Sequence, residues 1–177
     1  MFLDKVNTEL AVRVVYASIG PEAVEQAKLL SGQANSSMVV QPAELLFGGG
    51  VLMQQIKLPT LAVKGVPVRV HVVGISFTTF RASSEATTEL ELGALKTDGL
   101  VFVVPEQPQS ELRAAYEHAR SQPLGKLYGA VIAPAGFDVA VLGAGVDVPV
   151  VSGRRAAMDA LQAVMKPLLL DLAKQFG

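Results

Sequence analysis

The stretch "VRVVYASIGPEAVEQAKLL", residues 12–30, has the layout of a phosphate-binding site: an apolar strand, a Gly-Pro turn and the start of a helix. In such a site, glycines let backbone N–H groups converge on the phosphates, a lysine supplies positive charge and a Ser or Thr hydroxyl holds Mg²⁺. The pattern GxxxxGK[ST] falls here on eight consecutive residues: Ala17, Ser18, Ile19, Gly20, Pro21, Glu22, Ala23 and Val24. The layout therefore raises the question of whether the chemistry is present.

The residue types that do this chemistry are missing from the stretch. Ala17 and Glu22 stand at the glycine positions, Ala23 at the lysine and Val24 at the hydroxyl. Pro21 has no N–H to donate, and the Glu22 carboxylate lies where a phosphate would bind. Since a hydrogen bond to a charged group contributes about 1.5 to 3 kcal/mol, we predict that the turn does not bind nucleotide phosphates. By itself, the stretch is equally compatible with a strand–helix unit of an unrelated α/β protein.

The elements that must position this turn alternate along the chain. Apolar, β-rich runs at 11–17, 66–73, 100–104, 130–133 and 148–151 predict strands. Apolar residues at helical spacing predict helices at 21–31, 109–121 and 155–175, with a kink at Pro167. We therefore predict one α/β domain over residues 1–177, a central, mostly parallel six-stranded sheet with helices on both faces. Within 33–57 the three glycines at 48–50 favour a mobile loop or an edge hairpin.

Composition excludes several functions. There is no cysteine, so disulfides and thiolate chemistry are excluded, and two distant histidines make a zinc site improbable. The net charge of −1, with dispersed cations, does not favour nucleic-acid binding. No apolar run reaches the length of about 20 residues that a membrane span needs, and the start "MFLDKVNTEL" is unlike a signal peptide. We expect a cytoplasmic protein.

Three further stretches carry a family resemblance. They are "LPTLAVKGVPVRVHVVGISFTTFR" (58–81), "TDGLVFVVPEQPQ" (97–109) and "VPVVSGRRAAMDALQAVMKPLLLDLA" (148–173). In order and spacing the chain resembles the small Ras-like GTPases, most closely the bacterial polarity and gliding-motility GTPases of the MglA type. The resemblance covers about three-quarters of the chain. It implies a small-GTPase domain.

The remaining nucleotide motifs of that family are degenerate in this sequence. Where the family has a switch glycine followed by a water-orienting Gln, the sequence reads "GISFTT", with Phe77 and Thr78. The base-reading Asn-Lys-x-Asp motif falls on "AGFD" (135–138) and keeps only Asp138, which could equally form a turn. A switch threonine would fall within 33–57, where Ser36 and Ser37 are weak candidates. The resemblance therefore implies a pseudo-GTPase without catalytic residues, cofactor or metal.

The segment "SFTTFR" is the candidate for binding a partner, because this region of the family touches regulators. Phenylalanine area beside an arginine is favoured at interface hot spots. The alternative is that the phenylalanines fill the empty nucleotide cleft, which Ile19 and Val24 are also predicted to close, holding the domain in one state. The candidate residues are Phe77, Thr78, Thr79, Phe80 and Arg81.

The sequence thus predicts a non-catalytic small-GTPase-like scaffold in a bacterial polarity, motility or signalling complex. The resemblance implies roadblock-type (LC7) dimers as partners. Two alternatives remain: a divergent GTPase that hydrolyses GTP with atypical or partner-supplied residues, and an α/β module for another small ligand. His71, among apolar strand residues, is expected to be a packed or edge histidine rather than a general base.

Overall fold

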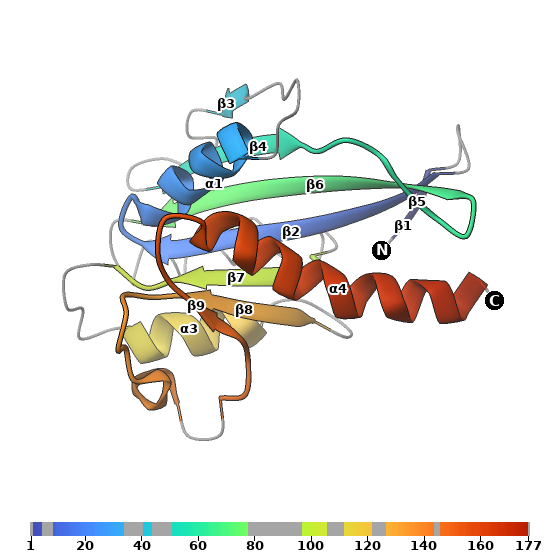
Figure 1. Ribbon diagram of the computed structural model, residues 1–177. Helices are drawn as coiled ribbons and strands as arrows, with labels where there is room; N and C mark the ends of the chain where they lie inside the picture. Colours follow the sequence, from blue (N-terminus) through green and yellow to red (C-terminus); the bar gives the residue numbers. More distant parts are fainter. Residues whose placement is uncertain are drawn as a thin grey trace.

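The computed structural model describes most of the chain, and its elements alternate between strands and helices (Figure 1). The described residues are 2–4, 9–33, 41–43, 51–77, 97–105, 112–121, 127–143 and 146–176. The strands are β1 (Phe2–Asp4), β2 (Glu9–Ile19), β3 (Gln41–Ala43), β4 (Val51–Lys57), β5 (Leu61–Val63), β6 (Val66–Phe77), β7 (Gly99–Val103), β8 (Tyr128–Ile132) and β9 (Val150–Val151). The helices are α1 (Glu22–Gln33), α3 (Leu112–Ser121), α4 (Ala156–Phe176) and the short 3₁₀ helix η1 (Val139–Leu142).

The described strands form one sheet in the order β3-β4-β6-β2-β7-β8-β9, with β1 beside β2 and β5 beside β6. The strands from β6 to β9 run parallel, and β4 is antiparallel to β6. The described part of the sheet therefore has nine strands rather than the six predicted. The three additional strands, β1, β3 and β5, are three residues long each. They are too short to give a readable alternation in sequence. The five predicted runs correspond to β2, β6, β7, β8 and β9, and β4 falls in the 33–57 region, where an edge hairpin was one of the two expectations.

Helices lie on both faces of the sheet, as predicted. Alternate strand residues such as Val14, Val72 and Val101 pack with α1 and α4 in the larger core cluster. Residues of the opposite parity, such as Phe102 and Val131, pack with α3 and η1 in a second cluster. The two-residue period of a strand sends consecutive side chains to opposite faces, so continuously apolar strands such as β7 supply both clusters.

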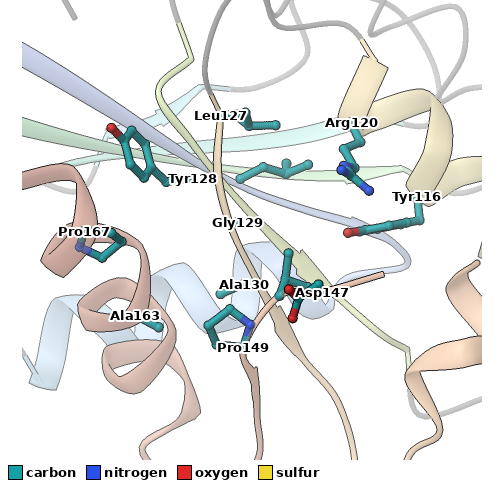
Figure 2. Close-up of a pocket in the computed structure, with 12 residues that line it drawn as sticks. Tyr116, Arg120, Leu127, Tyr128, Gly129, Ala130, Asp147, Pro149, Ala163 and Pro167 are labelled. Carbon is teal, nitrogen blue, oxygen red and sulfur yellow. The ribbon is translucent and has the colours of Figure 1, made fainter. Parts of the chain in front are cut away.

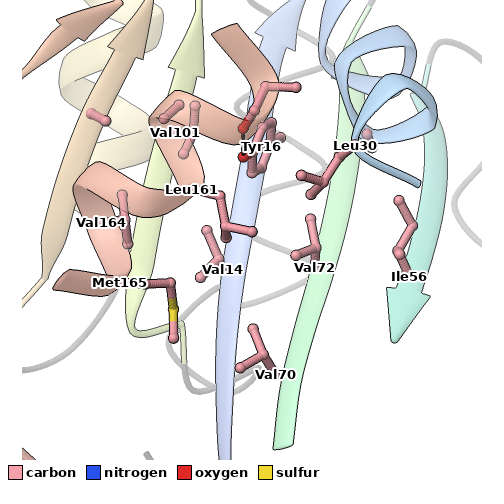
Figure 3. Close-up of a cluster of buried hydrophobic side chains, with 14 of the residues drawn as sticks. Val14, Tyr16, Leu30, Ile56, Val70, Val72, Val101, Leu161, Val164 and Met165 are labelled. Carbon is pink, nitrogen blue, oxygen red and sulfur yellow. Dashed lines mark hydrogen bonds between the residues drawn. The ribbon is translucent and has the colours of Figure 1, made fainter. Parts of the chain in front are cut away.

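Close contact between α4 and the middle of the sheet fixes the larger cluster (Figure 3). Leu161, Val164 and Met165 of α4 lie over Val14 of β2. The Tyr16 hydroxyl, fully buried, donates a hydrogen bond to the Ala157 carbonyl at 2.6 Å. Burial raises the pKa of Tyr16, so the phenol stays protonated and remains a donor.

The boundaries of the helices differ little from those predicted. The helix predicted at 21–31 is Glu22–Gln33, and that at 155–175 is Ala156–Phe176, with Pro167 inside it. The helix predicted at 109–121 is described from Leu112 to Ser121. In the 33–57 region, β3 pairs antiparallel with β4 at the sheet edge, which confirms the edge hairpin. The glycines at 48–50 lie outside the described residues.

Candidate functional site

The turn between β2 and α1 is the candidate site, since β2 ends at Ile19 and α1 begins at Glu22. Gly20 turns the chain with a φ of +118°, a conformation that L side chains rarely adopt. Pro21 then precedes the first helical residue, where its missing N–H costs no helical hydrogen bond. Gly20 and Pro21 are therefore explained by the backbone conformation of the turn.

The backbone donors that a phosphate would need are already bonded within the protein. The Ala23 N–H donates to Ser18 Oγ at 2.9 Å, and the Val24 N–H donates to Ser76 Oγ at 3.1 Å. The Ser18 hydroxyl donates to the Gly20 carbonyl at 2.7 Å. Ser18 and Ser76 are both buried. These hydroxyls act as caps for the first turn of α1, so no incoming anion is needed to satisfy Ala23 and Val24.

The Glu22 side chain folds back over the turn. A Cβ at Gly20 would overlap Glu22 Oε2, which places the carboxylate directly against the glycine. This oxygen is buried and has no hydrogen-bond partner among the described residues. A carboxylate in the first helical turn interacts favourably with the helix dipole, as a bound phosphate would. The Glu22 carboxylate therefore puts negative charge at the place where a nucleotide-binding loop leaves room for a phosphate.

A cleft of about 430 Å³ lies beside this turn, at the carboxyl ends of β7 and β8. It has two carboxylate-bearing residues of α1, Glu22 and Glu25, on one side and Gly153 and Ala156 at the start of α4 on the other. This is the position, beside the point where the chain crosses from β6 to β7, at which open α/β sheets commonly bind ligands. The cleft has the location of a ligand site but not the donors of a phosphate site.

The prediction that Ile19 helps to close this cleft is wrong. Ile19 is buried in the cluster on the opposite face of the sheet, with Phe102 and Tyr116. Strand parity decides this: Ile19 lies an odd number of residues from Tyr16, which faces α4, so its side chain points the other way. Val24 is part-exposed and is not among the residues that line the cleft.

The other predicted site residues are not brought together at the turn. Asp138 caps η1, its carboxylate accepting a hydrogen bond from the Ala140 N–H at 3.0 Å, so its observed role is that of a turn former. Phe77 ends β6, where its backbone pairs with Ile19 and Val51. Thr78, Thr79, Phe80 and Arg81, and likewise Ser36 and Ser37, lie outside the described residues.

A second cavity, of about 310 Å³, lies at the start of β8, between α3 and α4 (Figure 2). Arg120 and Asp147 supply opposite charges to its lining, together with Tyr116 and Tyr128. Burial raises the pKa of Tyr116, and Arg120, which hydrogen-bonds to it, opposes the shift. The Tyr128 hydroxyl donates to Asp171 of α4. This cavity combines aromatic and charged groups, and the sequence pattern did not predict that they lie together.

Sequence reasoning missed Ser76 and Glu25. Ser76 was read only as part of a degenerate switch motif, yet its hydroxyl caps α1 from the neighbouring strand. The parallel pairing of Ser18 with Ser76 brings the two hydroxyls side by side. A serine at the carboxyl end of each of two apolar strands was the available signal, but only the register shows that they are neighbours.

The fold and the turn define an α/β protein whose strand–turn–helix unit has the place, but not the donors, of a phosphate site. No protein-family model matches the chain, and no curated protein matches it. A solved structure that it resembles is the cytosolic domain of the T. maritima FeoB iron transporter in a GDP form. The identity is 14%, the TM-score is 0.48, and the match covers 92% of this chain and 63% of that one. At these values the likeness carries no argument, and the fold rests on the strand order above.

None of the described helices is long and apolar enough to span a bilayer. The described residues also hold no group of three or more metal-ligating side chains.

Proposed function

We propose that this chain is a small-GTPase-like protein that does not bind GTP and acts as a non-catalytic protein-interaction scaffold. The observation that carries the proposal is the internal satisfaction of the turn: Ser18 and Ser76 occupy the donors of Ala23 and Val24, and Glu22 lies against Gly20. A phosphate entering here would have to displace two buried hydroxyls and meet a carboxylate. The turn supplies no lysine to offset that cost.

The proposed partners are proteins, with roadblock-type dimers suggested by the resemblance to MglA-type GTPases. A bacterial polarity, motility or signalling complex is the corresponding process, and the cytoplasm the expected place. The proposed contact region is the end of β6 and the residues after it, 77–81. Because an internally capped turn has no nucleotide to exchange, binding to such a partner would not depend on GTP or GDP.

Titration with fluorescent GDP and GTP, with and without Mg²⁺, tests the proposal. We expect no saturable binding and no change in melting temperature with either nucleotide. A micromolar or tighter dissociation constant, or a melting temperature raised by several degrees, would instead support the divergent GTPase. Purification with the roadblock proteins encoded nearby tests the partner separately, since failure with all of them removes the partner and leaves the nucleotide result standing.

The open cleft favours one further candidate, a binding module for a small ligand other than a nucleotide. Its volume of about 430 Å³ falls within the range of ordinary ligand sites. Its carboxylate-bearing side at Glu22 and Glu25 suits a cationic group better than an anionic one. A thermal-shift screen of small amines and anions distinguishes the two, because only amines should raise the melting temperature.

A further inference from the structure

The cavity of about 310 Å³ at the start of β8 is separate from the turn and from the cleft beside it. It lies at the amino end of β8, whereas the turn and the cleft lie at the carboxyl ends of the strands. The cavity and the cleft share no lining residue. Ordinary small-molecule sites have volumes of about 300 to 1,000 Å³. This cavity is therefore large enough for a ligand of about the size of an amino acid.

Part of the cavity wall is an edge of β8 that β9 does not cover. The two strands pair at Val131 with Val150 and at Ile132 with Val151, and the Val131 N–H donates to the Pro149 carbonyl at 2.8 Å. In this parallel ladder the carbonyl two residues before Val131, that of Gly129, would accept from the N–H of residue 149. Proline has no N–H, so the Gly129 carbonyl lacks this ladder partner. Gly129 and Pro149 both line the cavity.

Opposite charges line the cavity without neutralising each other. Arg120 of α3 and Asp147, before β9, are both exposed lining residues. Among the described residues the two side chains form no ion pair with each other. Arg120 hydrogen-bonds to Tyr116, but a guanidinium has five N–H donors, so this bond leaves donors for a carboxylate. Figure 2 shows the side chains of Arg120, Tyr116 and Asp147 on the same side of β8.

Much of the remaining lining is apolar and comes from several elements. It consists mainly of Leu100, Leu127, Ala130, Val148, Ala163 and Pro167. The cavity thus combines a cation, a carboxylate and a backbone acceptor with an aliphatic surface. A ligand that fits it has an anionic group, a group that donates hydrogen bonds and carries positive charge, and a short apolar body.

We infer that this cavity binds a free aliphatic amino acid. The ligand's carboxylate pairs with Arg120, and its ammonium group donates to the Asp147 carboxylate and to the Gly129 carbonyl. Its side chain lies against the apolar lining. A ligand with only one of the two charges leaves either Arg120 or Asp147 without a partner, so recognition requires both groups.

Thermal-shift measurements with L-leucine, L-isoleucine and L-valine test the inference. 4-Methylpentanoate is the control, because it has the shape and the carboxylate of leucine but no ammonium group. At up to about 10 mM, at least one of the amino acids should raise the melting temperature by a few degrees, and 4-methylpentanoate should not. The apparent dissociation constant of the best amino acid then follows from its concentration dependence.

Variants assign the binding to this cavity. Arg120→Gln and Asp147→Asn should each raise the apparent dissociation constant about tenfold or more. Arg113→Gln, which removes the same charge from an exposed position of α3, should leave it unchanged. Pro149→Ala restores an N–H opposite the Gly129 carbonyl and should weaken binding several-fold, because this N–H competes with the ligand's ammonium group. Circular dichroism of each variant establishes that a loss of binding is not a loss of fold.

Three outcomes would overturn the inference. They are no rise in melting temperature with any of the three amino acids, an equal rise with 4-methylpentanoate, and equal binding by Arg120→Gln and Arg113→Gln. The inference does not rest on the proposed function, since the cavity is distant in the fold from the turn. A GTP titration of the same samples therefore reports on the turn alone, and either result can fail without the other.

Discussion

The carboxyl end of β2 and its middle differ in the charges that they carry. At its carboxyl end, the turn at 17–24 satisfies its donors with buried hydroxyls and holds its own carboxylate. Midway along β2, Arg13 pairs with His71 of β6, which in turn pairs with Lys57 at the end of β4. A protein that binds nucleotide phosphates needs positive charge at the carboxyl end of its strands. Here the turn at 17–24 carries no lysine or arginine, and basic residues pair across the strands farther along the sheet.

A substitution that crowds the contact between β7 and α4 should have the largest effect on stability. Gly99→Ala puts a Cβ into overlap with Val164 Cγ1 and 3.3 Å from Val14 Cγ2. Because valine has one strongly preferred rotamer in a helix, Val164 cannot easily move away. We expect a loss of about 2–3 kcal/mol in the free energy of unfolding, measured by urea denaturation.

The control for this prediction is the same change in a protein that already carries Val164→Ala. With the methyl groups removed, Gly99→Ala should cost clearly less. If Gly99→Ala lowers the free energy of unfolding equally in both backgrounds, the overlap with Val164 is not the cause of the loss.

Changing the turn itself should cost about 1–3 kcal/mol. Gly20→Ala introduces a side chain at a φ of +118° and into overlap with Glu22 Oε2. In Gly20→Ala/Glu22→Ala the overlap is gone but the backbone strain stays, so only part of the stability should return. Full recovery would show that the carboxylate, and not the backbone conformation, requires glycine here.

Removing one cap should have a smaller effect. Ser76→Ala deprives the Val24 N–H of its acceptor and should destabilise the protein by about 1 kcal/mol. Ser152→Ala, at an exposed position, is the matched control and should change the unfolding midpoint very little. Equal effects of the two variants would mean that Ser76 does not act as a cap of α1.

The smallest effect concerns His71, midway along β6, and the pH dependence of stability. The pKa of His71 is lowered below its ordinary value of 6.5, so the unfolded chain binds the proton first as the pH falls. Stability from this group is therefore complete above pH 6.5 and is lost as the pH falls toward the folded pKa. The melting temperature of the native chain, measured relative to that of His71→Gln, should therefore fall as the pH is lowered from 7.5 to 5.5. A difference that does not vary with pH would contradict a pKa of His71 lowered by its burial and by the cations around it.

The long strands and the three predicted helices could be predicted from the sequence because each depends on local periodicity. β7 is five continuously buried residues, and α1 begins after a proline. The strands β1, β3 and β5 were not predicted, because three residues carry no measurable alternation and form only beside a longer partner. The two-residue β9 was predicted only because it lies within the longer apolar run at 148–151. The same holds for the candidate site. The sequence shows that the turn lacks the lysine and the Mg²⁺-binding hydroxyl of a phosphate site, but its hydrogen bonds depend on the pairing of β2 with β6.

The amino-acid sequence by itself determined which groups are present: a proline and a glutamate at the start of α1, no cysteine, and apolar strands that must be covered on both faces. Only the tertiary structure decided which of them meet. The parallel register of β2 and β6 places Ser76 beside Ser18 and His71 between Arg13 and Lys57. Strand parity turns Ile19 away from the cleft. Local preferences act over a few residues, whereas these pairings join residues 14 positions apart for Lys57 and His71 and 58 apart for Ser18 and Ser76. Only the assembly of the sheet brings them within reach of a hydrogen bond or a charge.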